Sequence, residues 1–130
     1  MKYMLMMHVT GSGDDVLDWR PEDFKRMIEF QHEFDAGLVK SGEMVANDGL
    51  AFPDQARIVR AGEGGVPVVS DGPFAESKEF LIGFWIVDCA TPERAYEIAA
   101  QASSAPGPGG APLNIPIEVR PIVGPPPVDL

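Results

Sequence analysis

The residues best suited to chemistry lie between Val68 and Phe80, in the segment VVSDGPFAESKEF. Its Asp-Gly-Pro-Phe motif places the carboxylate of Asp71 at the expected end of a strand, where it could act as a general base or as a ligand. The same residues also fit a plain turn, in which Asp71 caps a neighbouring N–H, Gly72 takes a backbone angle that other residues avoid, and Phe74 anchors the loop in the core. The sequence leaves both interpretations open.

A group of charged residues, Glu76, Lys78 and Glu79, follows this motif. In an extended segment Glu76 and Lys78 project to the same side, and Glu79 begins the most apolar strand of the chain. In solvent the pair would form a weak salt bridge, contributing about 0 to 1 kcal/mol. If the loop covers a cavity instead, burial raises the pKa of a carboxyl group and Lys78 lowers it, so these residues could serve as a tuned acid or base.

Two more candidates lie elsewhere in the chain. His8 is the last of three side chains on one face of the first strand, and it is either a packed histidine or a base that approaches the loop of Glu76 and Lys78. Asp35 lies with Gln31 in the apolar stripe of the first helix, so it faces either the space between helix and sheet or the edge of that space.

The sequence favours neither a metal nor a bound cofactor. Its two histidines are far apart, and the single cysteine forms no Cys-His spacing of a metal site. The glycine-rich stretch GEGG lies in an expected hairpin rather than before a helix, which disfavours a phosphate site. We therefore expect no cofactor and no metal.

The elements that must position these residues follow from the hydrophobic pattern. Pro21 with its acidic neighbours begins a helix over residues 21–40 that Ser41-Gly42 ends, and Thr91 caps a second helix. Strands are predicted at residues 2–9, at 43–52, as two short strands around the 62–65 turn, at 79–88, and at 115–123. In the 79–88 strand, Leu81 and Trp85 are expected on one face and Ile82 on the other.

This order of elements predicts an α+β fold, a ferredoxin-like antiparallel sheet with both helices on one face. The first strand and the 79–88 strand become central in that topology, yet both are apolar on both faces. Met4, Leu81 and Trp85 would then form a wet apolar patch, which a second copy packed face to face would cover. The sequence therefore predicts a homodimer in which the two sheets form a barrel.

Composition limits the remaining choices. A chain of 130 residues with 45% hydrophobic residues fits one domain; we assign it to residues 1–124, followed by a proline-rich tail at 125–130. The net charge of -10 disfavours nucleic acid and anionic membrane as partners. The single cysteine and the lack of a membrane-length apolar stretch favour a cytoplasmic protein.

The segments DGPFAESKE and IGFWIVD resemble the YCII-related family, in the branch named for its Asp-Gly-Pro-Phe motif. The segments MKYMLMMHV, LVKSGEMVANDGL and IEVRPI are similar to other parts of that family. The resemblance implies a dimeric α/β barrel of ferredoxin-like subunits. Proteins of the wider family are proposed small-molecule enzymes with a histidine and aspartate pair, one of which removes chloride from a chlorinated hydroxyhydroquinone. Genes of this branch often accompany those of extracytoplasmic-function sigma factors.

Two functional hypotheses result. The first is a cofactor-independent small-molecule enzyme or ligand-binding protein, with its pocket between helices and sheet and lined by the Asp71–Glu79 loop. In it Asp71 or His8 is the base, Lys78 stabilises negative charge with Glu76 nearby, and Phe74, Glu79 and Asp35 contact the ligand. The second is a non-catalytic accessory module, for example in sigma-factor regulation, whose loop and tail bind another protein.

Overall fold

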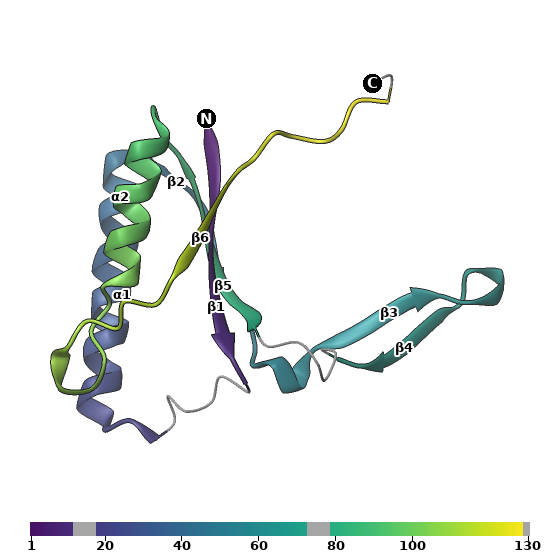
Figure 1. The fold of residues 1–130 in the computed structure, drawn as a ribbon, viewed down its shortest axis with the longest axis horizontal. Helices are drawn as coiled ribbons and strands as arrows, with labels where there is room; N and C mark the ends of the chain where they lie inside the picture. The colour runs from purple at the N-terminus through teal and green to yellow at the C-terminus, as the bar shows by residue number, and fades with distance from the viewer. Residues whose placement is uncertain (12–17, 73–78, 129–130) are drawn as a thin grey trace.

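The computed structural model describes residues 1–11, 18–72 and 79–128. Its elements, in chain order, are β1 Lys2–Thr10, α1 Pro21–Ser41, β2 Met44–Gly49, β3 Arg57–Ala61, β4 Pro67–Asp71, β5 Glu79–Asp88, α2 Pro92–Ser103 and β6 Ile117–Pro121. Four strands form one antiparallel sheet in the order β2-β5-β1-β6, and β3 pairs with β4 in a separate hairpin. Both helices cover one face of the sheet (Figure 1). The prediction of an α+β ferredoxin-like fold is confirmed.

The helices begin and end where the sequence places their signals. Pro21 occupies the first turn of α1, and Gly42 ends the helix at a φ of 78°, a left-handed conformation that glycine adopts without strain. The backbone N–H of Arg94 donates a hydrogen bond to Thr91 Oγ1 at 3.2 Å, which caps α2. Neither helix in the described part of the chain is long and apolar enough to cross a membrane.

The core lies between the helices and the sheet. The residues buried there are Tyr3, Leu5, Leu38, Trp85, Val87, Cys89, Ala95, Ile98, Ala99 and Ala102. Leu5, Val87 and Ile98 are fully buried. The free thiol of Cys89 belongs to this core, and burial raises its pKa, so it is an unreactive packing residue.

A β-bulge in β5 changes which face each side chain occupies. Met7 pairs with Gly83 but the next residue, His8, pairs with Leu81, so that Ile82 is the extra residue. The shift puts Leu81 on the opposite face from Trp85, which packs toward the helices and is 8% exposed. The predicted grouping of Leu81 with Trp85 is therefore wrong, because strict alternation along the strand stops at the bulge.

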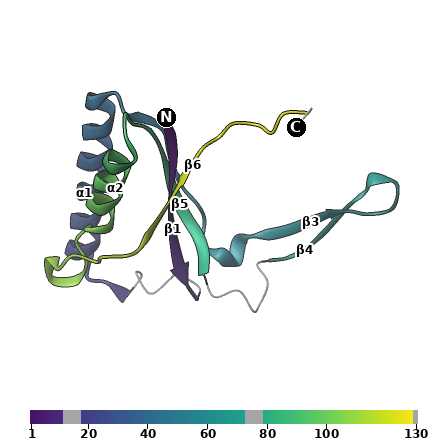
Figure 2. The same ribbon diagram turned by 45° about the horizontal axis from the view of Figure 1, so that its top comes forward.

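The other face of the sheet carries apolar side chains, and we call it the open face. By register, its residues on the two central strands are Met4, Met6, His8, Leu81, Phe84 and Ile86. All six are half-buried within the single chain. The β3–β4 hairpin and the segment after β6 extend away from the domain on the side opposite the helices (Figures 1 and 2).

Candidate functional site

The carboxylate of Asp35 is the centre of the candidate site. Trp85 Nε1 donates a hydrogen bond to Asp35 Oδ1 at 2.9 Å, and Asn47 Nδ2 donates one to Asp35 Oδ2 at 2.9 Å. Asp35 lies on α1, whereas Asn47 and Trp85 are cross-strand partners on β2 and β5. The register of the sheet therefore places both donors under one turn of the helix.

This carboxylate borders a cavity of about 220 Å³ between α1 and the sheet, which we call the polar cavity. Its lining residues are Met7, Gln31, Asp35, Asn47, Asp48, Gly49, Ile82, Gly83, Phe84 and Trp85. Gln31 and Asp35 are one helical turn apart on α1, so the same helix face presents both. The sequence left open whether Asp35 faces the space between helix and sheet or the edge of that space; in the structure it lines the polar cavity and accepts a hydrogen bond from Asn47 on the edge strand β2.

Two glycines leave room for the cavity. Gly49 and Gly83 are cross-strand partners in β2 and β5, on the face that carries Asn47 and Trp85. A Cβ atom added at Gly49 would meet no other atom within 4 Å, whereas one at Gly83 would lie 3.3 Å from the carbonyl oxygen of Asp48. The glycine pair thus removes two side chains from the floor beneath α1, and the space at Gly49 is open.

A second hollow of about 350 Å³ continues from the first and is almost wholly apolar; we call it the apolar cavity. Met7, Gln31 and Ile82 line both cavities. The other residues of the apolar cavity are Val9, Trp19, Phe24, Met27, Phe52, Ala102, Ser103, Ala105, Leu113 and Ile115. The hydroxyl of Ser103 already donates to the carbonyl of Ile115 at 2.7 Å, so it offers little polarity to a ligand. Together the cavities can hold a molecule with one polar end and an apolar body.

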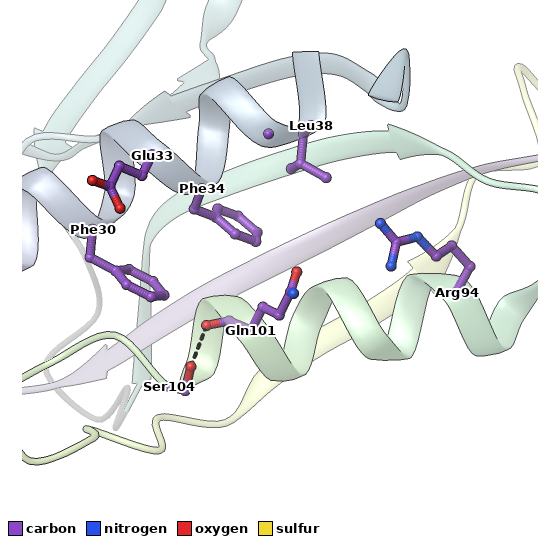
Figure 3. A pocket seen from close by; sticks show the side chains of 8 residues that line it. Phe30, Glu33, Phe34, Leu38, Arg94, Gln101 and Ser104 are labelled. Carbon is purple, nitrogen blue, oxygen red and sulfur yellow. Dashed lines mark hydrogen bonds between the residues drawn. The ribbon is translucent and has the colours of Figure 1, made fainter. Parts of the chain in front are cut away.

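A larger hollow of about 550 Å³ lies between the two helices, away from Asp35 (Figure 3). Phe30 and Phe34 enter it from α1, and the guanidinium of Arg94 extends toward it from α2. That guanidinium is already engaged, because it donates two hydrogen bonds of 2.8 Å to the carboxylate of Glu43 and one of 3.2 Å to Glu97. The bonds to Arg94 lower the pKa of Glu43, and those to Glu43 raise the pKa of Arg94. We interpret this ion pair as a structural link between α2 and the turn that joins α1 to β2.

The structure places Asp71 at the end of β4, where its side chain is 96% exposed and lies 3.6 Å from Arg57 Nε. None of the cavities described here includes it. Gly72, next in the motif, is not in the left-handed region, so the expected unusual backbone angle is wrong. Glycine is needed instead because a Cβ atom at Gly72 would lie 2.6 Å from Ile58 Cγ1, where the hairpin strands close. The predicted residues Phe74, Glu76 and Lys78 lie outside the described residues.

His8 and Glu79 lie together, but away from Asp35. They line a shallow hollow of about 180 Å³ with Pro116, Ile117 and Glu118. By register His8 is on the open face, across the sheet from the polar cavity. The predicted site residues that the structure describes are therefore divided among the polar cavity, the open face and the hairpin.

Sequence reasoning did not identify Asn47, Gly49 or Gly83, nor the indole N–H of Trp85 as a donor. One signal was present, since a buried tryptophan usually finds an acceptor for its N–H. The acceptor itself comes from a residue 50 positions away in the sequence. Only the pairing of β2 with β5 shows that Asn47 and Gly49 lie beside Trp85 and Gly83.

The comparisons with known proteins agree on the family. A family model of the YCII-related domain matches residues 1–109, which include β1, both helices and the polar cavity. The chain is also similar to an uncharacterised protein of Rhizobium meliloti, with 32% identity over 104 residues that cover 80% of this chain and 79% of that protein. The chain therefore belongs to the YCII-related family.

Proposed function

We propose that this protein binds a small organic molecule in the polar cavity and its apolar continuation, with Asp35 as the group that orients the molecule or accepts a proton from it. The observation that carries the proposal is the hydrogen-bonded carboxylate of Asp35 at the wall of a cavity. A carboxylate fixed by Trp85 and Asn47 is held in one position before a ligand arrives, which binding and acid–base chemistry both require.

Asp35 is the first residue to test because its two hydrogen-bond donors are both neutral. None of the ion pairs in the described residues includes it, so its charge is available to a ligand. The roles proposed for Asp71, Lys78, Glu76 and His8 remain predictions from the sequence. A role in the cytoplasm is consistent with the single, buried cysteine.

A fragment screen by ligand-observed NMR tests the proposal when it compares three proteins. Gly49→Val places a side chain in the open space of the polar cavity at a strand position that suits a β-branched residue. Gly37→Ala adds a methyl group on α1, also without a close contact, but in the hollow between the helices. We expect fragments that bind the wild type and Gly37→Ala but not Gly49→Val. Fragments that bind all three proteins equally, or no bound fragment at all, would contradict the proposed site.

The homodimer is part of the same proposal. The open face presents Met6 near its centre, between its partners Phe84 and Glu118. A second sheet packed on this face would remove its apolar side chains from water. We expect light scattering to give a dimer for the wild type and a monomer for Met6→Glu, because the new carboxylate would be buried beside Glu118 in both subunits. A monomeric wild type at micromolar concentration would overturn the dimer but leave the cavity in place.

The second candidate function, an accessory module that binds another protein, is favoured by the β3–β4 hairpin. An isolated two-stranded hairpin is marginally stable in water, yet this one exposes Val59 and Val69 by 59% each on one face. The double variant Val59→Glu, Val69→Glu separates the two candidates. If this variant is a monomer, the hairpin contacts the second subunit of the homodimer. If it stays a dimer but no longer forms the crosslinks to other proteins that the wild type forms in cells, the hairpin binds a different protein partner, for example in sigma-factor regulation.

A further inference from the structure

We propose that the ligand of this site is a cation with an apolar body, such as a protonated primary amine on an aromatic or aliphatic skeleton, with its ammonium group against Asp35. This inference rests on the proposed function and goes beyond it by naming the chemical class of the ligand.

The polar end of the site selects for positive charge. Its one carboxylate on the helix side, Asp35, accepts hydrogen bonds from an indole N–H and from an amide N–H, neither of which neutralises its charge. Among the described residues that line the two cavities there is no lysine, arginine or histidine. An anionic ligand would meet a like charge with no cation among these residues to balance it, while an ammonium group would complete an ion pair.

Trp85 fixes the charge that makes this selection. Its indole N–H donates to Asp35 Oδ1, so the carboxylate is held in place at the wall of the polar cavity. The net charge of -10 over the whole chain acts in the same direction at longer range, since it raises the local concentration of cations and lowers that of anions.

The body of the ligand is set by the apolar cavity. Apart from Gln31 and Ser103, its lining side chains are hydrophobic, and Met7 and Ile82 connect it to the polar cavity. With about 220 Å³ at the charged end and about 350 Å³ beyond it, the space suits a molecule of one or two rings rather than a metabolite that is polar throughout.

Three probes of matched shape test the charge preference: phenethylamine, phenethyl alcohol and phenylacetate, which carry a positive charge, no charge and a negative charge. Their dissociation constants are measured by titration calorimetry at neutral pH with the full chain. We expect the amine to bind about tenfold more tightly than the alcohol, equivalent to ~1.4 kcal/mol, and phenylacetate to bind more weakly still. Added salt should reduce the preference for the amine, because it screens an ion pair.

Two charge variants identify the residue responsible. Asp35→Asn removes the charge but keeps the shape, and the Asn47 amide can turn to keep a hydrogen bond to it. We expect the amine and the alcohol to bind this variant within about twofold of each other. Glu33→Gln, the matched control, removes a charge two residues away, on an exposed side chain outside both cavities, and should keep the wild-type ranking.

The outcomes separate this inference from the proposed function. If the alcohol or phenylacetate binds the wild type as tightly as the amine, and Gly49→Val abolishes binding, the cation preference is wrong and the pocket stands. If none of the three probes binds at millimolar concentration, the preference for a cation is also overturned. Whether the cavity binds any small molecule is then tested separately by the fragment screen with Gly49→Val and Gly37→Ala. If Glu33→Gln loses the ranking as fully as Asp35→Asn, the preference belongs to the net charge of the protein and not to Asp35.

Discussion

The hydrogen bond between Trp85 and Asp35 can be tested without knowing any ligand. Trp85→Phe removes the N–H donor and part of the ring, and Asp35→Ala removes the acceptor. A hydrogen bond to a charged group contributes about 1.5–3 kcal/mol, and the half-buried position of Asp35 favours the lower end of this range. Each single variant also loses packing or a second bond, the one from Asn47, so neither value alone measures the Trp85–Asp35 contact.

A double-mutant cycle isolates the contribution of the Trp85–Asp35 hydrogen bond. The packing lost with the tryptophan ring is nearly the same in both backgrounds and cancels. We expect a coupling free energy of about 1–2 kcal/mol between Trp85→Phe and Asp35→Ala, because the 2.9 Å bond exists only when both residues are present. The free energies of unfolding come from urea titrations followed by far-ultraviolet circular dichroism at neutral pH.

The control cycle combines Trp85→Phe with Glu33→Ala, which removes an exposed carboxylate from the same helix without touching the indole. Its coupling should be within about 0.3–0.5 kcal/mol of zero, the usual limit for independent sites. A Trp85–Asp35 coupling no larger than that of the control would refute the geometry of the polar cavity. Both the proposed function and the preference for a cation would then lose their structural basis.

Two further predictions concern the frame around the site. Glu43→Gln should lower the free energy of unfolding by about 1–2 kcal/mol at pH 7, because it weakens the two-pronged bond to Arg94. Because folding lowers the pKa of Glu43 from its ordinary value of 4.5, the stability that wild type gains over Glu43→Gln is fully present above pH 4.5 and is lost as the pH falls through the folded-state pKa. Urea titrations at a series of pH values measure this difference in the free energy of unfolding. A difference that does not change with pH would contradict the assignment. Thr91→Ala should cost about 1 kcal/mol by removing the cap of α2, measured by thermal unfolding, with Thr91→Ser restoring most of it; an unchanged melting temperature in Thr91→Ala would contradict the cap.

Local patterns in the sequence were enough to place most elements. Pro21 and Gly42 bound α1 because proline suits the first turn of a helix and glycine suits the left-handed residue that ends it. The same helical period put Asp35 in the apolar stripe, so one residue of the site could be identified from the sequence. The order of the elements along the chain predicted a ferredoxin-like sheet, which the structure confirms.

The Asp-Gly-Pro-Phe motif made Asp71 a candidate because an acidic residue in a turn beside other charges is typical of a site as well as of a plain turn. In the structure Asp71 is in solvent, and Gly72 accommodates Ile58. The local sequence of a turn or an ion pair is the same whether it lies in solvent or lines a cavity. Burial, which decides the difference, is not a local property.

The amino-acid sequence by itself determined the helices, the strands and the apolar stripe that carries Asp35, because these depend on neighbours a few residues apart. Only the tertiary structure decided what Asp35 meets. The bulge at Ile82 put Leu81 on the face opposite Trp85, and the pairing of β2 with β5 brought Asn47 under the helix and put Gly49 beside Gly83. Register between distant strands is fixed by the packing of the whole sheet, so the space that these residues enclose exists only in the folded chain.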